Sequence, residues 1–309
     1  MSLVALILAL LIEHGLTVLL RLREPRWLDR WCDWVGGRLA GLRGVAAHLL
    51  LAVAVLLPVA PVAIVDALLG SHLLGLLQVA FAVLVLLVSF GPRDLREEVE
   101  DYIDALERGD REAATRGAKE LLESDLAGRD TPPRDAVEDA IFVQANNRVF
   151  GVIFWFMVLG PAGAWLFRVT DLMRRRAAFE ASRAAAAGDG AGEAVAGAKD
   201  HAAALGQLHG LLAWVPARLA AGAYALAGSF EDAVGHWRAV VDDVGAGLLA
   251  RTEDLLARVG RGALAPSLVG VAAGSLDLAT AGGALRIVTR AIWIWLAVVA
   301  LLVLVGAVA

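Results

Sequence analysis

The sequence contains a single cysteine, Cys32, among its 309 residues, so the chain can form no internal disulfide and no cysteine-based zinc site. We expect Cys32 to be a small packed side chain, with a free reactive thiol as the alternative. The six histidines include no i, i+4 pair, so a histidine metal site is not expected. No basic stripe interleaved with aromatic residues supports nucleic-acid binding. The motifs of a nucleophile elbow, a Walker loop and a dinucleotide fingerprint are absent as well.

Long apolar runs are abundant instead. Hydrophobic residues make up 59% of the chain and its mean hydropathy is +0.66, whereas soluble domains are about 45–50% apolar. The sequence therefore predicts an integral membrane protein. Strand-like alternation is absent, so the predicted class is all-α, with about four transmembrane helices plus re-entrant or broken helices and cytoplasmic amphipathic helices. The predicted spans are Ser2–Leu20, Val45–Leu69, His72–Phe90 and Ile287–Ala309.

The alternation of polar and apolar stretches predicts the organisation of the chain. Residues 1–90 are N-terminal membrane helices with an interfacial segment at 21–44, and 91–148 are a cytoplasmic helical region. A re-entrant hairpin at 149–167 precedes a cytoplasmic Ala/Gly-rich helical region at 168–207. A broken membrane-associated segment at 208–228, an amphipathic helical region at 229–286 and a C-terminal transmembrane helix at 287–309 follow. The tryptophans of 21–44 recur at helical spacing, which fits an interfacial helix or a helix that packs its Trp face on the bundle.

The segment Val149–Phe167 is apolar enough to enter a bilayer, yet Gly160-Pro161 interrupts it. An unbroken span would place Arg148 on one side of the membrane and Arg174–Arg176 on the other. A helical hairpin that returns to the cytoplasmic face avoids this conflict with the positive-inside rule. Non-helical backbone at membrane depth is tolerated only where it is buried in protein or lines a wet cavity. The hairpin and its flanks are therefore the predicted functional site, and the arginine triplet is expected to contact lipid headgroups.

Two charged residues fall inside apolar segments. Glu13 lies near the middle of the first predicted span, where a charge costs roughly 2.5–3.5 kcal/mol on insertion scales, so it needs a partner or a wet cavity. Arg218, in the broken segment at 208–228, is the candidate partner. The Glu13 carboxylate would either face a ligand or a metal ion or form a structural ion pair, or Glu13 would lie at a shallower depth in the membrane.

Two polar motifs near the hairpin suit an anionic ligand. The loop of Gly128, Arg129, Asp130 and Thr131 combines groups that bind a phosphate, with a divalent cation bridging to Asp130; a helix cap is the alternative. A second group precedes the hairpin and is predicted to line its mouth, with surface amides as the alternative. Its members are Gln144, Asn146, Asn147 and Arg148.

Several of these segments resemble the CobD/CbiB superfamily, and the resemblance covers nearly the whole chain. It rests on Phe90–Leu95 with the polar helix that runs to Gly109-Asp110, and on the loop at 128–131. Its most specific parts are FGVIFWFMVLGPAGAWLFR and the later WVPARLAAGAYALAG. The superfamily has two branches: adenosylcobinamide-phosphate synthases of cobalamin biosynthesis, and AmpE-type membrane proteins linked to β-lactamase induction.

Departures from the synthase pattern favour the AmpE branch. Where the synthases carry an acidic residue and an Asn, then an Asp-Gly pair, this chain has Val143 and Gln144, then Asn147 and Arg148. The segment Asn-Thr-Leu-Asp-Ser-Met that follows the hairpin in the synthases is shortened here to Val169–Met173, and their first-span Asp is replaced by Glu13. The resemblance thus implies that the groups suited to ATP-driven amide formation are largely lost.

The predicted function is that of an AmpE-like regulatory or sensory protein of the bacterial inner (cytoplasmic) membrane, crossing it several times and linked to β-lactamase induction and cell-wall stress. The alternatives are a CobD/CbiB-type ATP-dependent amide-forming synthase and a purely structural membrane partner. Its predicted partners are the lipid bilayer, a nucleotide or other phosphorylated ligand with Mg²⁺, and further copies of the chain. No catalytic residue is predicted. The predicted ligand-binding residues are Glu13, Arg93, Gly128, Arg129, Asp130, Thr131, Gln144, Asn147, Asp171 and Arg218, with Asp130 as the metal ligand.

Overall fold

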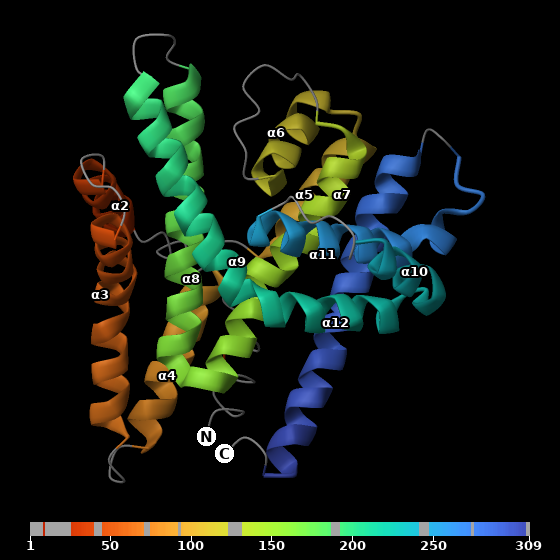
Figure 1. The fold of residues 1–309 in the computed structure, drawn as a ribbon. Coiled ribbons are helices and arrows are strands. Elements are labelled where there is room, and N and C mark those ends of the chain that lie inside the picture. The colour runs from red at the N-terminus through yellow and green to blue at the C-terminus, as the bar shows by residue number, and fades with distance from the viewer. Residues whose placement is uncertain are drawn as a thin grey trace. The chain divides into compact units, whose positions relative to one another are not determined.

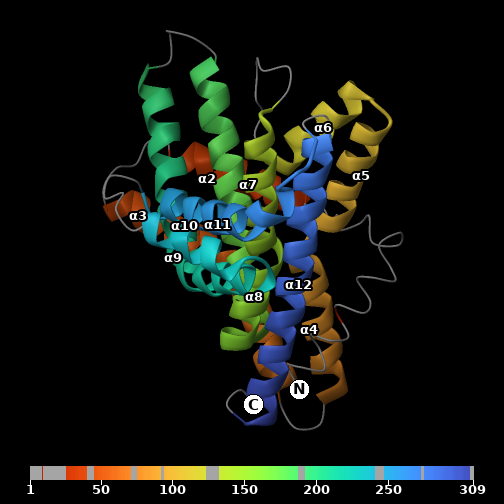
Figure 2. The same ribbon diagram turned by 90° about the vertical axis from the view of Figure 1, so that its right-hand side faces the viewer.

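The computed structural model describes Ala9 and residues 26–39, 45–70, 75–91, 94–122, 132–186, 192–240, 247–272 and 275–306. Every regular element among these residues is a helix (Figures 1 and 2), which confirms the predicted all-α class. Of the predicted first span, all residues except Ala9 lie outside the described residues. Five helical stretches are long and apolar enough to cross a membrane by length and composition: Leu49–Leu69, Gly75–Glu107, Arg134–Ala186, Val195–Ala227 and Leu276–Leu302.

The chain forms two compact units. The first contains Met1–Pro92 and Val152–Leu212. Its helices are α2 (Arg26–Leu39), α3 (Val45–Leu69), α4 (Gly75–Phe90), nearly all of α8 (Gly151–Ala186) and the first part of α9 (Gly192–Ala227). The second contains Arg93–Gly151 and Ala213–Ala309. Its helices are α5 (Leu95–Glu107), α6 (Arg111–Leu122), α7 (Arg134–Ala145), the π-helix η1 (Asn146–Phe150), the rest of α9, α10 (Phe230–Val240), α11 (Leu248–Leu264), η2 (Ala265–Leu268) and α12 (Leu276–Leu304).

In the first unit, an indole N–H bonds the carbonyl that a proline leaves without its usual helical partner. Pro58 has no N–H, so the carbonyl of Ala54, four residues earlier, loses its intrahelical donor. The indole of Trp31 on α2 donates to that oxygen over 3.0 Å. In the same way, Pro216 leaves the carbonyl of Leu212 without a donor, and the Trp155 indole bonds it over 2.9 Å. Side chains thus satisfy the carbonyls that Pro58 in α3 and Pro216 in α9 leave without a donor.

This arrangement gives a testable prediction. We expect Trp31→Phe to lower the free energy of unfolding by about 1–3 kcal/mol, because the Ala54 carbonyl would be left without a bond. In a Pro58→Ala background the alanine's own N–H can serve that carbonyl, so the same Trp31→Phe change should cost clearly less. Thermal or denaturant unfolding in detergent, arranged as a double-mutant cycle, measures the difference. An equal cost in both backgrounds would contradict the arrangement.

Helix α8 reverses its direction at Gly160, which has the non-helical angles φ 67° and ψ −155°. A Cβ added at Gly163 would lie 2.2 Å from the carbonyl oxygen of Trp155 and 2.6 Å from Leu159 Cβ. In a straight α-helix, residues eight apart are separated by about 12 Å. The chain therefore folds back into two arms, of which the second continues to Ala186, well beyond the end of the predicted hairpin at Phe167. Re-entry of this hairpin into the bilayer stays a prediction.

The second unit packs its helices around an aromatic and alanine-rich core. The hydroxyl of Tyr224 on α9 donates to the carbonyl of Phe142 on α7 over 2.9 Å, and both side chains are buried. The ring of Phe150 lies 5.8 Å from that of Tyr224 and 5.6 Å from that of Trp295 on α12. Gly260 on α11 faces the Phe142 ring so closely that a Cβ there would meet it at 2.4 Å. These contacts fix α7, α9, α11 and α12 around one core.

Candidate functional site

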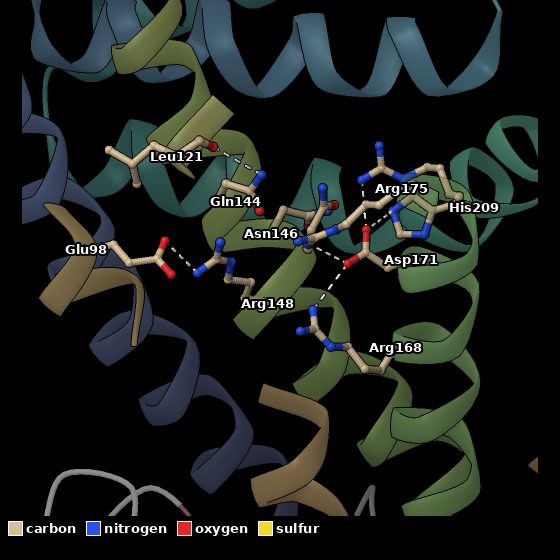
Figure 3. Close-up of polar contacts among 11 residues, drawn as sticks. Glu98, Leu121, Gln144, Asn146, Arg148, Arg168, Asp171, Arg175 and His209 are labelled. Atoms are coloured by element: carbon tan, nitrogen blue, oxygen red, sulfur yellow. Dashed lines mark hydrogen bonds and ion pairs between the residues drawn. The ribbon is translucent and has the colours of Figure 1, made fainter. Parts of the chain in front are cut away.

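The first unit contains a buried cluster of charges centred on Asp171 (Figure 3). Residues 168, 171, 174 and 175 are spaced i, i+3, i+6 and i+7, so they share one face of the second arm of α8. The Asp171 carboxylate is fully buried and pairs with Arg168 Nη1 at 3.2 Å, Arg174 Nη2 at 2.8 Å and Arg175 Nη2 at 2.5 Å. One carboxylate thus organises three guanidinium groups.

Two neighbouring elements complete the surroundings of Asp171. His209 of α9 is fully buried, and its Nε2 lies 3.8 Å from Asp171 Oδ1. The ring of Phe167 lies 5.0 Å from the His209 ring. Gly91 follows α4 with φ 105°, and a Cβ at this position would lie 2.7 Å from Arg168 Nη2. Glycine at 91 therefore leaves the space that the Arg168 side chain occupies.

The donor set of this cluster suits an anion. Each guanidinium has five N–H donors in a planar fork that matches phosphate or carboxylate oxygens. Three cations and an imidazole around a single carboxylate do not suit a divalent cation. Among the described residues, no group of three or more His, Cys, Asp or Glu side chains could hold a metal ion. The predicted cation ligand, Asp130, lies outside the described residues.

The arginine triplet after the hairpin does not act as the single lipid-facing anchor that the sequence predicts. Arg174 and Arg175 turn toward Asp171 and are only 14% and 18% exposed. Arg176 points elsewhere and pairs with Asp33 of α2 at 2.8 Å and with Glu180 at 3.1 Å. The buried acid Asp171 draws in the two arginines that its helix face presents.

The second unit contains another buried polar group, at the π-helix η1 (Figure 3). Arg148 pairs with Glu98 of α5 at 2.9 Å, with each side chain 10% exposed. The Asn146 amide donates to Asn147 Oδ1 over 3.3 Å, and the Gln144 amide donates to the Leu121 carbonyl over 3.4 Å. π-Helical turns are rare in proteins, and those that occur are often found at functional sites. The four predicted polar residues before the hairpin are all buried, so they are not surface side chains.

The structure places four of the ten predicted ligand-binding residues. Asp171 is the centre of the first cluster, whereas Gln144 and Asn147 belong to the second. Arg218 lies on the α9 surface, with its guanidinium 3.9 Å above the Trp214 ring and Nη1 bonded to the Trp214 carbonyl over 3.0 Å. The remaining six lie outside the described residues: Glu13, Arg93, Gly128, Arg129, Asp130 and Thr131.

Sequence reasoning missed three residues of these clusters. Arg168 shares the helical spacing of Asp171, Arg174 and Arg175, so the pattern of one acid among three arginines on one helix face was a usable signal. His209 and Glu98 come from other helices, and no local pattern marks either of them. Their positions follow from tertiary packing alone.

The five long apolar helical stretches define a multi-pass membrane protein. Two of these stretches also contain residues of buried ion pairs. The chain belongs to the family described as the regulatory signalling modulator protein AmpE, whose family model matches residues 1–309. The predicted relationship to the CobD proteins is confirmed as well. The cobalamin biosynthesis protein CobD of Stutzerimonas stutzeri (strain A1501) is 28% identical over 162 residues, which cover 50% of this chain and 47% of that protein.

A second CobD protein, from Chromobacterium violaceum, is 27% identical over 257 residues, which cover 76% of this chain and 75% of that relative. The chain thus spans about half the length of the first relative and three quarters of the second. No solved structure matches the chain.

Proposed function

We propose that this chain is a membrane regulatory protein that takes part in β-lactamase induction and cell-wall stress signalling, and that it responds to an anionic, phosphate-bearing ligand bound at the Asp171 cluster. The observation that carries the proposal is the convergence of Arg168, Arg174 and Arg175 on one fully buried carboxylate. The AmpE family supports the regulatory role. The bacterial inner membrane is the proposed location.

The arrangement favours recognition over bond formation. Asp171 holds the three guanidinium groups in fixed positions, so little side-chain freedom would be lost when a ligand binds. Guanidinium groups are suited to bidentate contacts with phosphate oxygens. Ligand binding would then add negative charge beside Asp171 and change how the second arm of α8 packs against α9. Such a change would be the signal that a partner protein reads.

The ligand can be tested directly. Purified protein in detergent is titrated with ATP and with inorganic pyrophosphate, each with and without magnesium. Arg175→Gln should weaken binding at least tenfold, and Arg175→Lys should weaken it less, because lysine keeps the charge but not the fork. Arg176→Gln is the matched control, since the neighbouring Arg176 pairs with Asp33 and Glu180 instead. Absence of wild-type binding at millimolar ligand, or equal losses in Arg175→Gln and Arg176→Gln, would refute this site.

The regulatory role has a separate test. Deletion of the gene in its own bacterium should change the β-lactamase activity that a β-lactam induces, and the wild-type chain should restore it. Arg175→Gln should fail to restore induction although it reaches the membrane in normal amounts. Unchanged induction in the deletion strain would remove the proposed role whatever the ligand measurements show.

A second candidate is an ATP-dependent amide-forming synthase, which the similarity to two CobD proteins favours. Against it, Arg148 stands where the resemblance implies a glycine of the synthases, and its charge is paired with Glu98. A coupled assay with ATP, a corrinoid carboxylate and an amino-alcohol phosphate separates the two candidates. Nucleotide turnover that depends on both co-substrates would favour the synthase.

A further inference from the structure

Helix α9 carries an exposed apolar face along its second part, which belongs to the second unit. Trp214, Val215, Leu219 and Leu226 are 42%, 39%, 49% and 64% exposed. The opposite face is fully packed into the core of the unit through alanines and Tyr224. A helix that is apolar on both faces, with one face outside the core, needs a second apolar environment. In a multi-pass membrane protein that environment is the bilayer.

The direction of this part of α9 differs from that of a spanning helix. In Figure 1 the second part of α9 runs across the view, while α12 runs from top to bottom. In Figure 2, which is turned by 90°, the second part of α9 is seen nearly end-on, while α12 keeps its direction. Since α12 has the length and composition of a membrane span, residues 213–227 lie crosswise to a span of the same unit. A helix in that direction lies parallel to the membrane plane.

Aromatic contacts set the depth of this helix. Tyr224 meets the ring of Phe150, and Phe150 meets Trp295 of α12. Two residues before Trp295 stands Trp293, which is 68% exposed, and one turn before that Arg290 is exposed. Tryptophan and arginine at one level of a span mark the headgroup region. The second part of α9 therefore lies at the boundary between headgroups and acyl chains.

Arg218 supplies the charge that such a position requires. Its guanidinium stacks on Trp214 at 3.9 Å, and one nitrogen bonds the Trp214 carbonyl, so the side chain lies along the helix surface. Exposed neighbours on both sides of it are apolar. A stacked guanidinium beside an apolar face matches a lipid phosphate above acyl chains.

We infer that residues 213–227 form an in-plane interfacial helix and that Trp214 and Arg218 bind the phosphate of an anionic phospholipid. The inference is independent of the anionic ligand proposed at Asp171, because it concerns other residues in the other unit. It assigns the exposed face of α9 to lipid and not to a second copy of the chain.

Nitroxide depth measurements in phosphatidylglycerol liposomes test the helix direction. Four variants in a Cys32→Ala background each carry one labelled cysteine. Two of them replace Val215 or Leu226 of α9, which are eleven residues apart on one face. The other two replace Trp293 or Leu304 of α12, which are also eleven residues apart. The α12 pair should differ in depth by about 16 Å, from a rise of 1.5 Å per residue, whereas the α9 pair should differ by less than about 5 Å. A depth difference for the α9 pair equal to that of α12 would overturn the inference. Labels at 215 and 226 shielded from both lipid-soluble oxygen and aqueous reagent would also overturn it, in favour of a protein partner.

The lipid phosphate is tested by thermal unfolding in nanodiscs. Wild type should melt several degrees higher in phosphatidylglycerol than in phosphatidylcholine, and Arg218→Gln should lose at least half of that difference. Arg116→Gln, an exposed arginine of α6, is the matched control and should keep it. Equal lipid dependence in Arg218→Gln and wild type would refute the contact. Inorganic phosphate that reproduces the stabilisation in phosphatidylcholine would refute lipid as the source.

Discussion

Asp171→Ala should lower the stability of the protein by about 3–5 kcal/mol, because it leaves three guanidinium groups in a buried site without their shared carboxylate. Any single arginine-to-methionine change in the cluster should cost less, since two arginines would still satisfy Asp171. Adding Arg175→Met to Asp171→Ala should recover part of the loss. Thermal unfolding in detergent and the yield of folded protein measure the relative stabilities of these variants.

The control for this prediction is Asp33→Ala. Asp33 pairs with Arg176 at a similar distance, but its side chain is 52% exposed. Exposed pairs contribute about 0–1 kcal/mol, so this variant should melt almost like wild type. If Asp171→Ala behaved like Asp33→Ala, the cluster would not be a buried network.

Gly163→Ala should prevent the α8 hairpin from closing and lower stability by more than about 3 kcal/mol. The added Cβ would fall 2.2 Å from a backbone oxygen of Trp155, and backbone cannot move aside as the end of a flexible side chain can. The expected result is loss of folded protein in detergent, measured by size-exclusion chromatography and thermal unfolding.

Gly197→Ala is the matched control. Gly197 lies inside helix α9, and a Cβ there meets nothing within 4 Å. Alanine is favoured over glycine in a helix by about 0.5–1 kcal/mol, so this variant should be as stable as wild type or slightly more stable. Similar losses in Gly163→Ala and Gly197→Ala would show that the hairpin arms are not in close contact.

The chain reversal at Gly160-Pro161 was predictable from local chemistry. Proline lacks the N–H that a continuing helix needs, and glycine accepts a positive φ that other residues avoid. The arginines at both ends then indicated a hairpin. The extent of the second arm was not predictable in this way, because Arg168–Ala186 reads equally well as a polar helix of its own.

The site was predictable only in part. Asp171 is one of the ten predicted ligand-binding residues, but the sequence assigns Arg174 and Arg175 to the membrane surface because runs of arginine usually mark a topology boundary. Because Asp171 is fully buried, Arg174 and Arg175 pair with it instead of facing lipid headgroups. The burial of Asp171 depends in turn on how α4, α8 and α9 pack. Proline offered another incomplete signal: Pro58 and Pro216 each leave a helix carbonyl without its donor, while the indoles that bond these carbonyls come from distant residues.

The π-helix η1 has a consequence for comparing this chain with its relatives. A π-turn holds one residue more than an α-turn, so it offsets the residues that follow it by one position of the helix. Deleting Asn147 would restore α-helical register and rotate Arg148 by about 100° away from Glu98. A relative of equal length that lacks the π-turn would present its side chains after this point on a different face of the helix. Across 146–150, a residue role therefore carries over between this chain and a relative only where both have the π-turn, even if their sequences align without a gap.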